Sequence, residues 1–208
     1  MRCITLCERQ QGGIYMKEKS RMSTRTMVLA AIMTALVFLL QWMGAFVKIG
    51  PFAISLVTIP IVIGGAECGK GVGAWLGLVF GTAVLLSGDA ALFLAVNPVG
   101  TFITVLLKGI LCGFAAAAVY ELVKKFNKYV AVVVAAFTCP VVNTGVYLLG
   151  CLAFFMDAVT EWATAAGLGG NVGQYMIVGL VGINFLVELA STIILSPVVV
   201  RLLNIKNK

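Results

Sequence analysis

The sequence predicts an all-α integral membrane protein, a bundle of six transmembrane helices with both termini in the cytoplasm. Hydrophobic residues make up 61% of the 208 residues and charged residues only 11%, whereas a soluble domain carries roughly 25% charged residues. The apolar residues gather in long runs, and the basic residues gather between alternate runs. These three observations indicate one membrane domain, with no room in the chain for a separate soluble domain.

Six apolar runs approach or exceed the length of about 20 residues that a helix needs to cross a bilayer. The second run is short, and Pro51 and Pro60 limit regular helix within it. A membrane β-barrel is excluded because its strands alternate apolar and polar residues, whereas these runs are continuous. The runs are Met27–Val47, Ile49–Ala66, Gly71–Gly88, Pro98–Tyr120, Tyr129–Met156 and Gln174–Val200.

The first 21 residues are predicted to be a polar tail, and residues 22–205 the six-helix membrane domain. Met16 begins a more natural start, so residues 1–15 are expected to be an over-extended gene start or a disordered tail. The first apolar run is too long for the core of a secretory signal and has no small-residue cleavage site after it.

The basic residues predict the orientation. With six spans, thirteen of the fifteen Lys and Arg residues lie on the side that holds both termini, Lys48 lies on the other side, and Lys108 lies within the membrane. Cytoplasmic loops are enriched in Lys and Arg, so both termini are predicted to be cytoplasmic in a multi-pass protein of the cell membrane. The net charge of +7 then reflects topology and attraction to anionic lipid, and no basic face is left for nucleic acid.

Three outer connections are longer than the inner ones, and the longest, 157–171, carries Gly167, Gly169 and Gly170. Two interpretations stay open: the outer loops close over something that arrives from outside, or they are simply variable in length.

Missing residues exclude several functions. The chain has no histidine, no phosphate-binding G-x-x-x-x-G-K-[ST] motif and no C-x-x-C pair among its six cysteines. We therefore expect no catalytic residues, no metal site and no cofactor, and the cysteines are expected to be small buried apolar residues.

Polar residues, with a few small ones, form one stripe on each of the last three predicted helices. Helical spacing places each set on one face, whereas the first three runs carry almost no such residues. The sets are Thr101, Thr104, Lys108, Cys112 and Ala115; Pro140, Asn143, Tyr147 and Cys151; and Asn184, Glu188 and Ser191.

Lys108 is the main functional candidate, because a charge at the centre of a membrane helix costs about 2.5–3.5 kcal/mol on insertion scales. Either an ion pair with Glu188 offsets this cost as a structural strut, or Lys108 binds an anionic group of a ligand. Both roles can coexist if Glu188 holds Lys108 until the ligand arrives.

Small residues at four-residue spacing predict close helix contacts. Gly73, Gly77 and Gly81 form one such face, Gly109 and Gly113 a second, and Ala31 with Ala35 a third. Each face is either internal or, for the alanine pair, a docking face for another membrane protein.

The chain resembles the substrate-binding S components of energy-coupling factor (ECF) vitamin transporters. The resemblance covers about residues 22–205 and rests on six helices, on "VLAAIMTAL", on "KIGPFAISLVTIPIVIGG" and on "NPVGTFITVLLKGILCGFAAAAVYELVKK". It implies a subunit that binds a vitamin or related micronutrient near the outer face, with partners in a membrane T component and two cytoplasmic ATPases. It also implies that Ala31 and Ala35 dock on the T component.

For the substrate, Lys108 followed by Asn143-Thr144 is similar to the pantothenate-related branch. The expected substrate-binding residues are Lys108, Asn143, Tyr147, Asn184, Glu188 and Trp42. A carboxylate would pair with Lys108, while Trp42 and Trp162 are equally suited to stack on a ring such as a flavin.

Two other classes stay open. One is a stand-alone secondary transporter in which Lys108 and Glu188 relay protons or ions, although six short helices without an inverted repeat are few for alternating access. The other is a small intramembrane enzyme, for which the sequence holds no motif.

Overall fold

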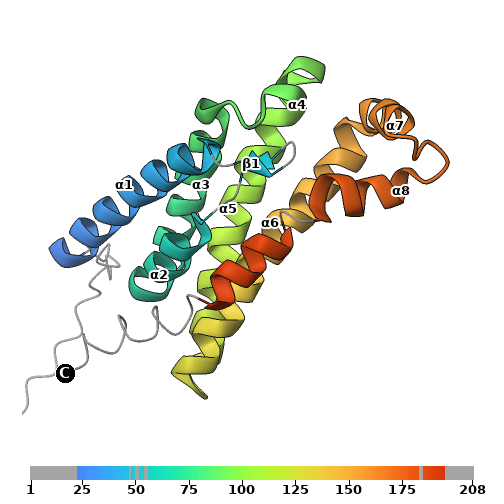
Figure 1. Ribbon diagram of the computed structural model, residues 1–208. Helices are drawn as coiled ribbons and strands as arrows, with labels where there is room; N and C mark the ends of the chain where they lie inside the picture. Colours follow the sequence, from blue (N-terminus) through green and yellow to red (C-terminus); the bar gives the residue numbers. More distant parts are fainter. Residues whose placement is uncertain (1–22, 47, 50–51, 54–55, 183–184, 195–208) are drawn as a thin grey trace, which may run out of the picture.

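A computed structural model describes residues 23–46, 48–49, 52–53, 56–182 and 185–194, and these residues are almost entirely helical. Figure 1 shows long helices side by side, with the short helices α4 and α7 at one end of the bundle and the turn between α5 and α6 at the other. The predicted tail, residues 1–21, lies outside the described residues.

Within this part of the chain, five segments are long and apolar enough to cross a membrane. The α-helical membrane class is thus confirmed, whereas the six-span count and the side of the termini stay predictions. The segments are Thr24–Gly44 of α1 (Thr24–Phe46), α3 (Lys70–Ser87), α5 (Pro98–Val123), α6 (Lys128–Phe154) and Val172–Ile194.

The prediction that residues 49–66 form a transmembrane helix is wrong. Strands β1 (Lys48–Ile49) and β2 (Phe52–Ala53) pair antiparallel, and α2 (Thr58–Cys68) follows with 11 residues. At 1.5 Å per residue α2 is only about 16 Å long, roughly half the thickness of the hydrocarbon core. Pro60 is tolerated because it lies in the first turn of α2, where its missing N–H has no helical partner.

Helices α3 and α5 meet through their glycine faces, as the small-residue spacing indicated. A Cβ atom added to Gly77 would collide with the carbonyl oxygen of Gly109, and one added to Gly113 would collide with that of Gly73. The two backbones therefore touch directly, which only glycine permits on both sides. Both faces are internal contacts of the bundle.

Helix α6 packs on the neighbouring side of α5, where Gly150 makes room for the side chain of Thr104. Helix α5 thus lies between α3 and α6 and contributes residues to both interfaces. Its N-terminus is fixed by Asn97, whose Oδ1 atom accepts a hydrogen bond from the backbone N–H of Gly100 at 3.0 Å, and by Pro98 in the first turn.

Two connections that the sequence suggested as outer loops contain helices. The α3–α5 connection turns at Gly88, in the left-handed region with φ of 80°, and forms α4 (Ala91–Val96). The connection that follows α6 forms the amphipathic helix α7 (Met156–Ala165), which buries Val159 and Ala163. The short helix α8 (Val172–Gln174), the π-helical segment η1 (Tyr175–Gly182) and a helix of residues 185–194 follow.

The opposite end of the bundle carries basic residues. Lys70, at the start of α3, forms an ion pair with Glu121 near the end of α5, with Nζ and Oε2 3.1 Å apart. Asn127 caps α6 by accepting a hydrogen bond from the backbone N–H of Tyr129 at 2.8 Å. Lys124, Lys125 and Lys128 lie at the same turn.

Candidate functional site

A cavity of about 110 Å³ lies between the α3–α5 pair on one side and α6, η1 and the helix of residues 185–194 on the other. A single buried water needs roughly 10–15 Å³, so this space suits a small organic molecule. Its lining residues are Gln41, Phe80, Val84, Asp89, Ala90, Phe93, Thr101, Thr104, Val105, Lys108, Asn143, Thr144, Tyr147, Cys151, Phe155, Leu180, Val181, Phe185 and Glu188.

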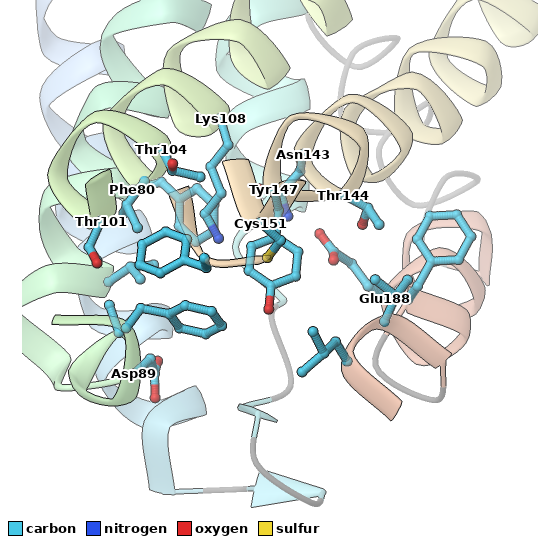
Figure 2. Close-up of a pocket in the computed structure, with 18 of the residues that line it drawn as sticks. Phe80, Asp89, Thr101, Thr104, Lys108, Asn143, Thr144, Tyr147, Cys151 and Glu188 are labelled. Carbon is cyan, nitrogen blue, oxygen red and sulfur yellow. The ribbon is translucent and has the colours of Figure 1, made fainter. Parts of the chain in front are cut away.

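Lys108 extends from α5 toward this cavity (Figure 2). Its Nζ atom lies 5.8 Å from the centroid of the Phe80 ring and 5.6 Å from that of the Tyr147 ring, within cation–π range of both. No hydrogen bond or ion pair joins the ammonium to another described residue. The two rings hold the charge in place and leave its N–H donors available.

Glu188 points into the cavity from the helix of residues 185–194, and Figure 2 shows Tyr147 and Cys151 between it and Lys108. The residue is only 2% exposed, and its Oε1 atom has no hydrogen-bond partner among the described residues. No direct ion pair joins it to Lys108 within this part of the chain. The predicted strut is therefore not formed, although opposite charges face each other.

Two further polar atoms at the cavity are buried without hydrogen-bond partners among the residues described, the Oδ1 of Asn143 and the Oγ1 of Thr104. Such atoms lose the water they would bond in solvent, so they are rare unless something else satisfies them. The neighbouring Thr101 differs, because its hydroxyl donates to the carbonyl of Asn97 at 2.8 Å. The Asn143 and Thr104 oxygens, which have no partner among the described residues, mark the part of the cavity wall suited to a polar ligand.

Aromatic rings close the cavity toward the α4–α7 end. Phe93 of α4 makes edge-to-face contacts with Tyr147, Phe155 and Trp162, at centroid distances of 5.8, 5.1 and 5.4 Å. Trp162 belongs to α7, so Phe93 joins both short helices to α6 over the cavity. These contacts favour the lid interpretation of the outer connections.

A hydrogen-bond network ties α1 to the cavity mouth. The amide Nε2 of Gln41 donates to Oδ2 of Asp89 at 2.6 Å, and the hydroxyl of Ser87 donates to the same oxygen at 3.1 Å. Gln41 is 4% exposed. Asp89 lies two residues after the end of α3, so this network holds the turn before α4 against α1.

Four of the six predicted substrate-binding residues line the cavity together: Lys108, Asn143, Tyr147 and Glu188. Asn184 lies outside the described residues. Trp42 is 48% exposed, packs against Phe38 and does not line the cavity.

Sequence reasoning missed several lining residues, chiefly Gln41, Phe80, Asp89 and Phe93. Gln41 is a polar residue inside an apolar run, and Asp89 is the one acidic residue between the third and fourth runs. Those two signals were available. Phe80 carried no signal, because an aromatic residue in an apolar run is ordinary. Phe93 lies in the connection between the third and fourth runs, where no spacing distinguished it.

Taken together, the fold and the cavity define a helical membrane protein with a cavity between its helices. The family model "ECF transporter, substrate-specific component" matches residues 25–203. The chain therefore belongs to this family, and it is a substrate-binding transporter subunit. The family's role is binding rather than catalysis, in a multi-pass membrane protein. No curated protein and no solved structure gives a significant match.

Proposed function

We propose that the protein captures a vitamin or related micronutrient from outside the cell and delivers it inward with a T component and two cytoplasmic ATPase subunits. The observation that carries the proposal is the cavity in which Lys108, between two aromatic rings, offers N–H donors that no other described residue accepts. Membrane charges are costly and mark functional sites, and here the cost is offset when an anionic group binds.

The position of the cavity supports capture from outside. It lies toward the end with α4 and α7, whereas Lys70, Lys124, Lys125 and Lys128 lie toward the other end. The positive-inside rule makes that basic end cytoplasmic. A ligand then enters under α4 and α7, in a protein of the cell membrane whose termini face the cytoplasm.

Helix α1 is proposed to dock on the T component. Ala31 and Ala35 are both exposed on α1, about one turn apart on the same face. Small exposed side chains let a second helix approach closely. The docking face therefore lies on a helix that, among the described residues, contributes Gln41 to the cavity.

Pantothenate is the leading substrate. Its carboxylate suits Lys108, and its hydroxyl and amide groups suit Asn143 and Glu188. Lysine is a point charge without bidentate geometry, so a carboxylate at Lys108 would gain its further hydrogen bonds from neighbouring groups. The aromatic lining from Phe80, Phe93 and Phe155 suits the apolar part of the molecule.

Uptake reconstituted in proteoliposomes tests this function. The protein together with T and ATPase subunits is expected to accumulate labelled pantothenate when ATP is present, and not without these partners. Accumulation by the protein alone, driven by a proton or sodium gradient, would instead favour the secondary transporter in which Lys108 and Glu188 form a relay.

A further inference from the structure

Three charged residues line the cavity, and two of them, Lys108 and Glu188, demand opposite chemistry from the molecule that fills it. The third, Asp89, already accepts hydrogen bonds from Gln41 and Ser87. Lys108 presents only hydrogen-bond donors, and ionised Glu188 presents only acceptors. They point toward each other from opposite walls (Figure 2) without forming a direct ion pair. A ligand that satisfies both must therefore carry an acceptor at one end and donors at the other.

The hydrogen-bond acceptors at the Glu188 end of the cavity are buried, which makes their need for donors strong. Its Oε1 atom and the Oδ1 atom of Asn143 are both buried acceptors without partners among the described residues, and the two residues are 2% and 8% exposed. A buried carboxylate is tolerated only when hydrogen bonds replace its lost water. The missing donors are expected to come from the occupant of the cavity.

The charges also decide the orientation of the occupant. A carboxylate is attracted to Lys108 and repelled by Glu188, because like charges in a weakly polar surrounding interact strongly. Phe80, Phe93 and Phe155 line the cavity as well and suit an apolar segment between the two ends.

We propose that the cavity selects a small two-ended molecule, with a carboxylate or similar acceptor at Lys108 and O–H or N–H donors at Glu188 and Asn143. The inference rests on the proposed function, since it describes the substrate of that same site. It adds that Glu188 is a specificity-determining residue and that a ligand lacking either end is rejected.

Binding to the purified full-length protein in nanodiscs tests the two ends separately. The probes are pantothenate and pantothenyl alcohol, which keeps the hydroxyl and amide donors but has CH₂OH in place of the carboxylate. The wild type is expected to bind pantothenate about tenfold or more tighter, the size of one charge-assisted hydrogen bond. Lys108→Met should remove this preference, whereas Glu188→Gln should weaken both probes by about tenfold and keep the preference.

Matched controls separate these effects from general damage. Leu107→Ala changes the neighbour of Lys108 that is 47% exposed, and Glu161→Gln changes an exposed carboxylate of α7. Both should bind like the wild type. A preference for pantothenate that survives in Lys108→Met, or unchanged binding in Glu188→Gln, overturns the two-ended inference and leaves the proposed function intact.

Native mass spectrometry of the purified protein distinguishes a failure of the two-ended inference from a failure of the proposed function. A bound small molecule with both an acceptor end and donors supports the inference even if it is not pantothenate. A bound molecule that lacks one end contradicts the inference alone. A protein that carries no small molecule and binds none of the B vitamins offered contradicts the proposed function itself.

Discussion

Gly77 of α3 and Gly109 of α5 lie backbone against backbone, so close that a Cβ atom on either would overlap the carbonyl oxygen of the other. This contact places the segment of α5 that carries Lys108 against the segment of α3 that carries Phe80. The close approach of two helices thus sets the position of the charge, because Phe80 and Lys108 each lie three or fewer residues from these glycines.

Gly77→Ala is expected to destabilise the protein by about 2 kcal/mol or more, since the added methyl meets rigid backbone rather than a movable side chain. The midpoint of an SDS titration would measure the change. Gly71→Ala is the control on the same helix, because nothing lies within 4 Å of its added Cβ. That control should be neutral or stabilising, by roughly 0.5–1 kcal/mol. Equal effects at the two sites would contradict the contact.

Phe93→Leu is expected to speed release of bound substrate by about tenfold or more. The change keeps an apolar side chain but removes three edge-to-face contacts, each contributing about 0.5–1.5 kcal/mol. Dissociation of labelled substrate after dilution measures the rate. Leu92→Ala, at a neighbouring position that is 57% exposed, should release substrate at the normal rate. An unaltered rate in Phe93→Leu would show that α4 is not a lid.

Ala31→Trp is expected to leave substrate affinity unchanged and to abolish transport, because the indole would hold a partner helix away from α1. Equilibrium binding and uptake with T and ATPase subunits would measure the two effects. Leu36→Trp places the same side chain on another exposed face of α1 and should transport normally. Uptake that survives in Ala31→Trp would move the docking face elsewhere.

Thr58 and Thr192 form a buried hydroxyl pair, with their Oγ1 atoms 3.2 Å apart, between α2 and the helix that carries Glu188. The hydroxyl of Thr192 donates to the carbonyl of Glu188, so Thr58 is the donor within the pair. Changing each to Val, singly and together, should give a coupling energy of about 0.5–1.5 kcal/mol.

An SDS titration measures this cycle as well. Thr160→Val serves as the control, since its hydroxyl donates only to its own helix at an exposed position. Strictly additive effects of the two threonine changes would mean that the pair does not link α2 to the Glu188 helix.

The polar stripes were predictable because side chains on one helix follow a fixed period, so spacing alone places Thr104 with Lys108 and Asn143 with Tyr147. The residues that face these stripes across the cavity were not predictable from spacing. Gln41 comes from a segment far away in the chain, whereas Phe93 lies just before α5. The roles of both depend on how α1 and α4 pack against α5 and α6. The interruption before α2 was signalled by Pro51, but its form as an antiparallel pair of short strands was not.

Membrane class and the glycine contact faces follow from the sequence, because hydropathy and helical period are local properties. Whether Lys108 pairs with Glu188 is not a local property of the sequence. It depends on the separation of two helices that approach from opposite sides, and side-chain packing sets that separation. The tertiary structure places the two side chains on opposite sides of a cavity without a direct ion pair, because the packing of their helices holds them apart.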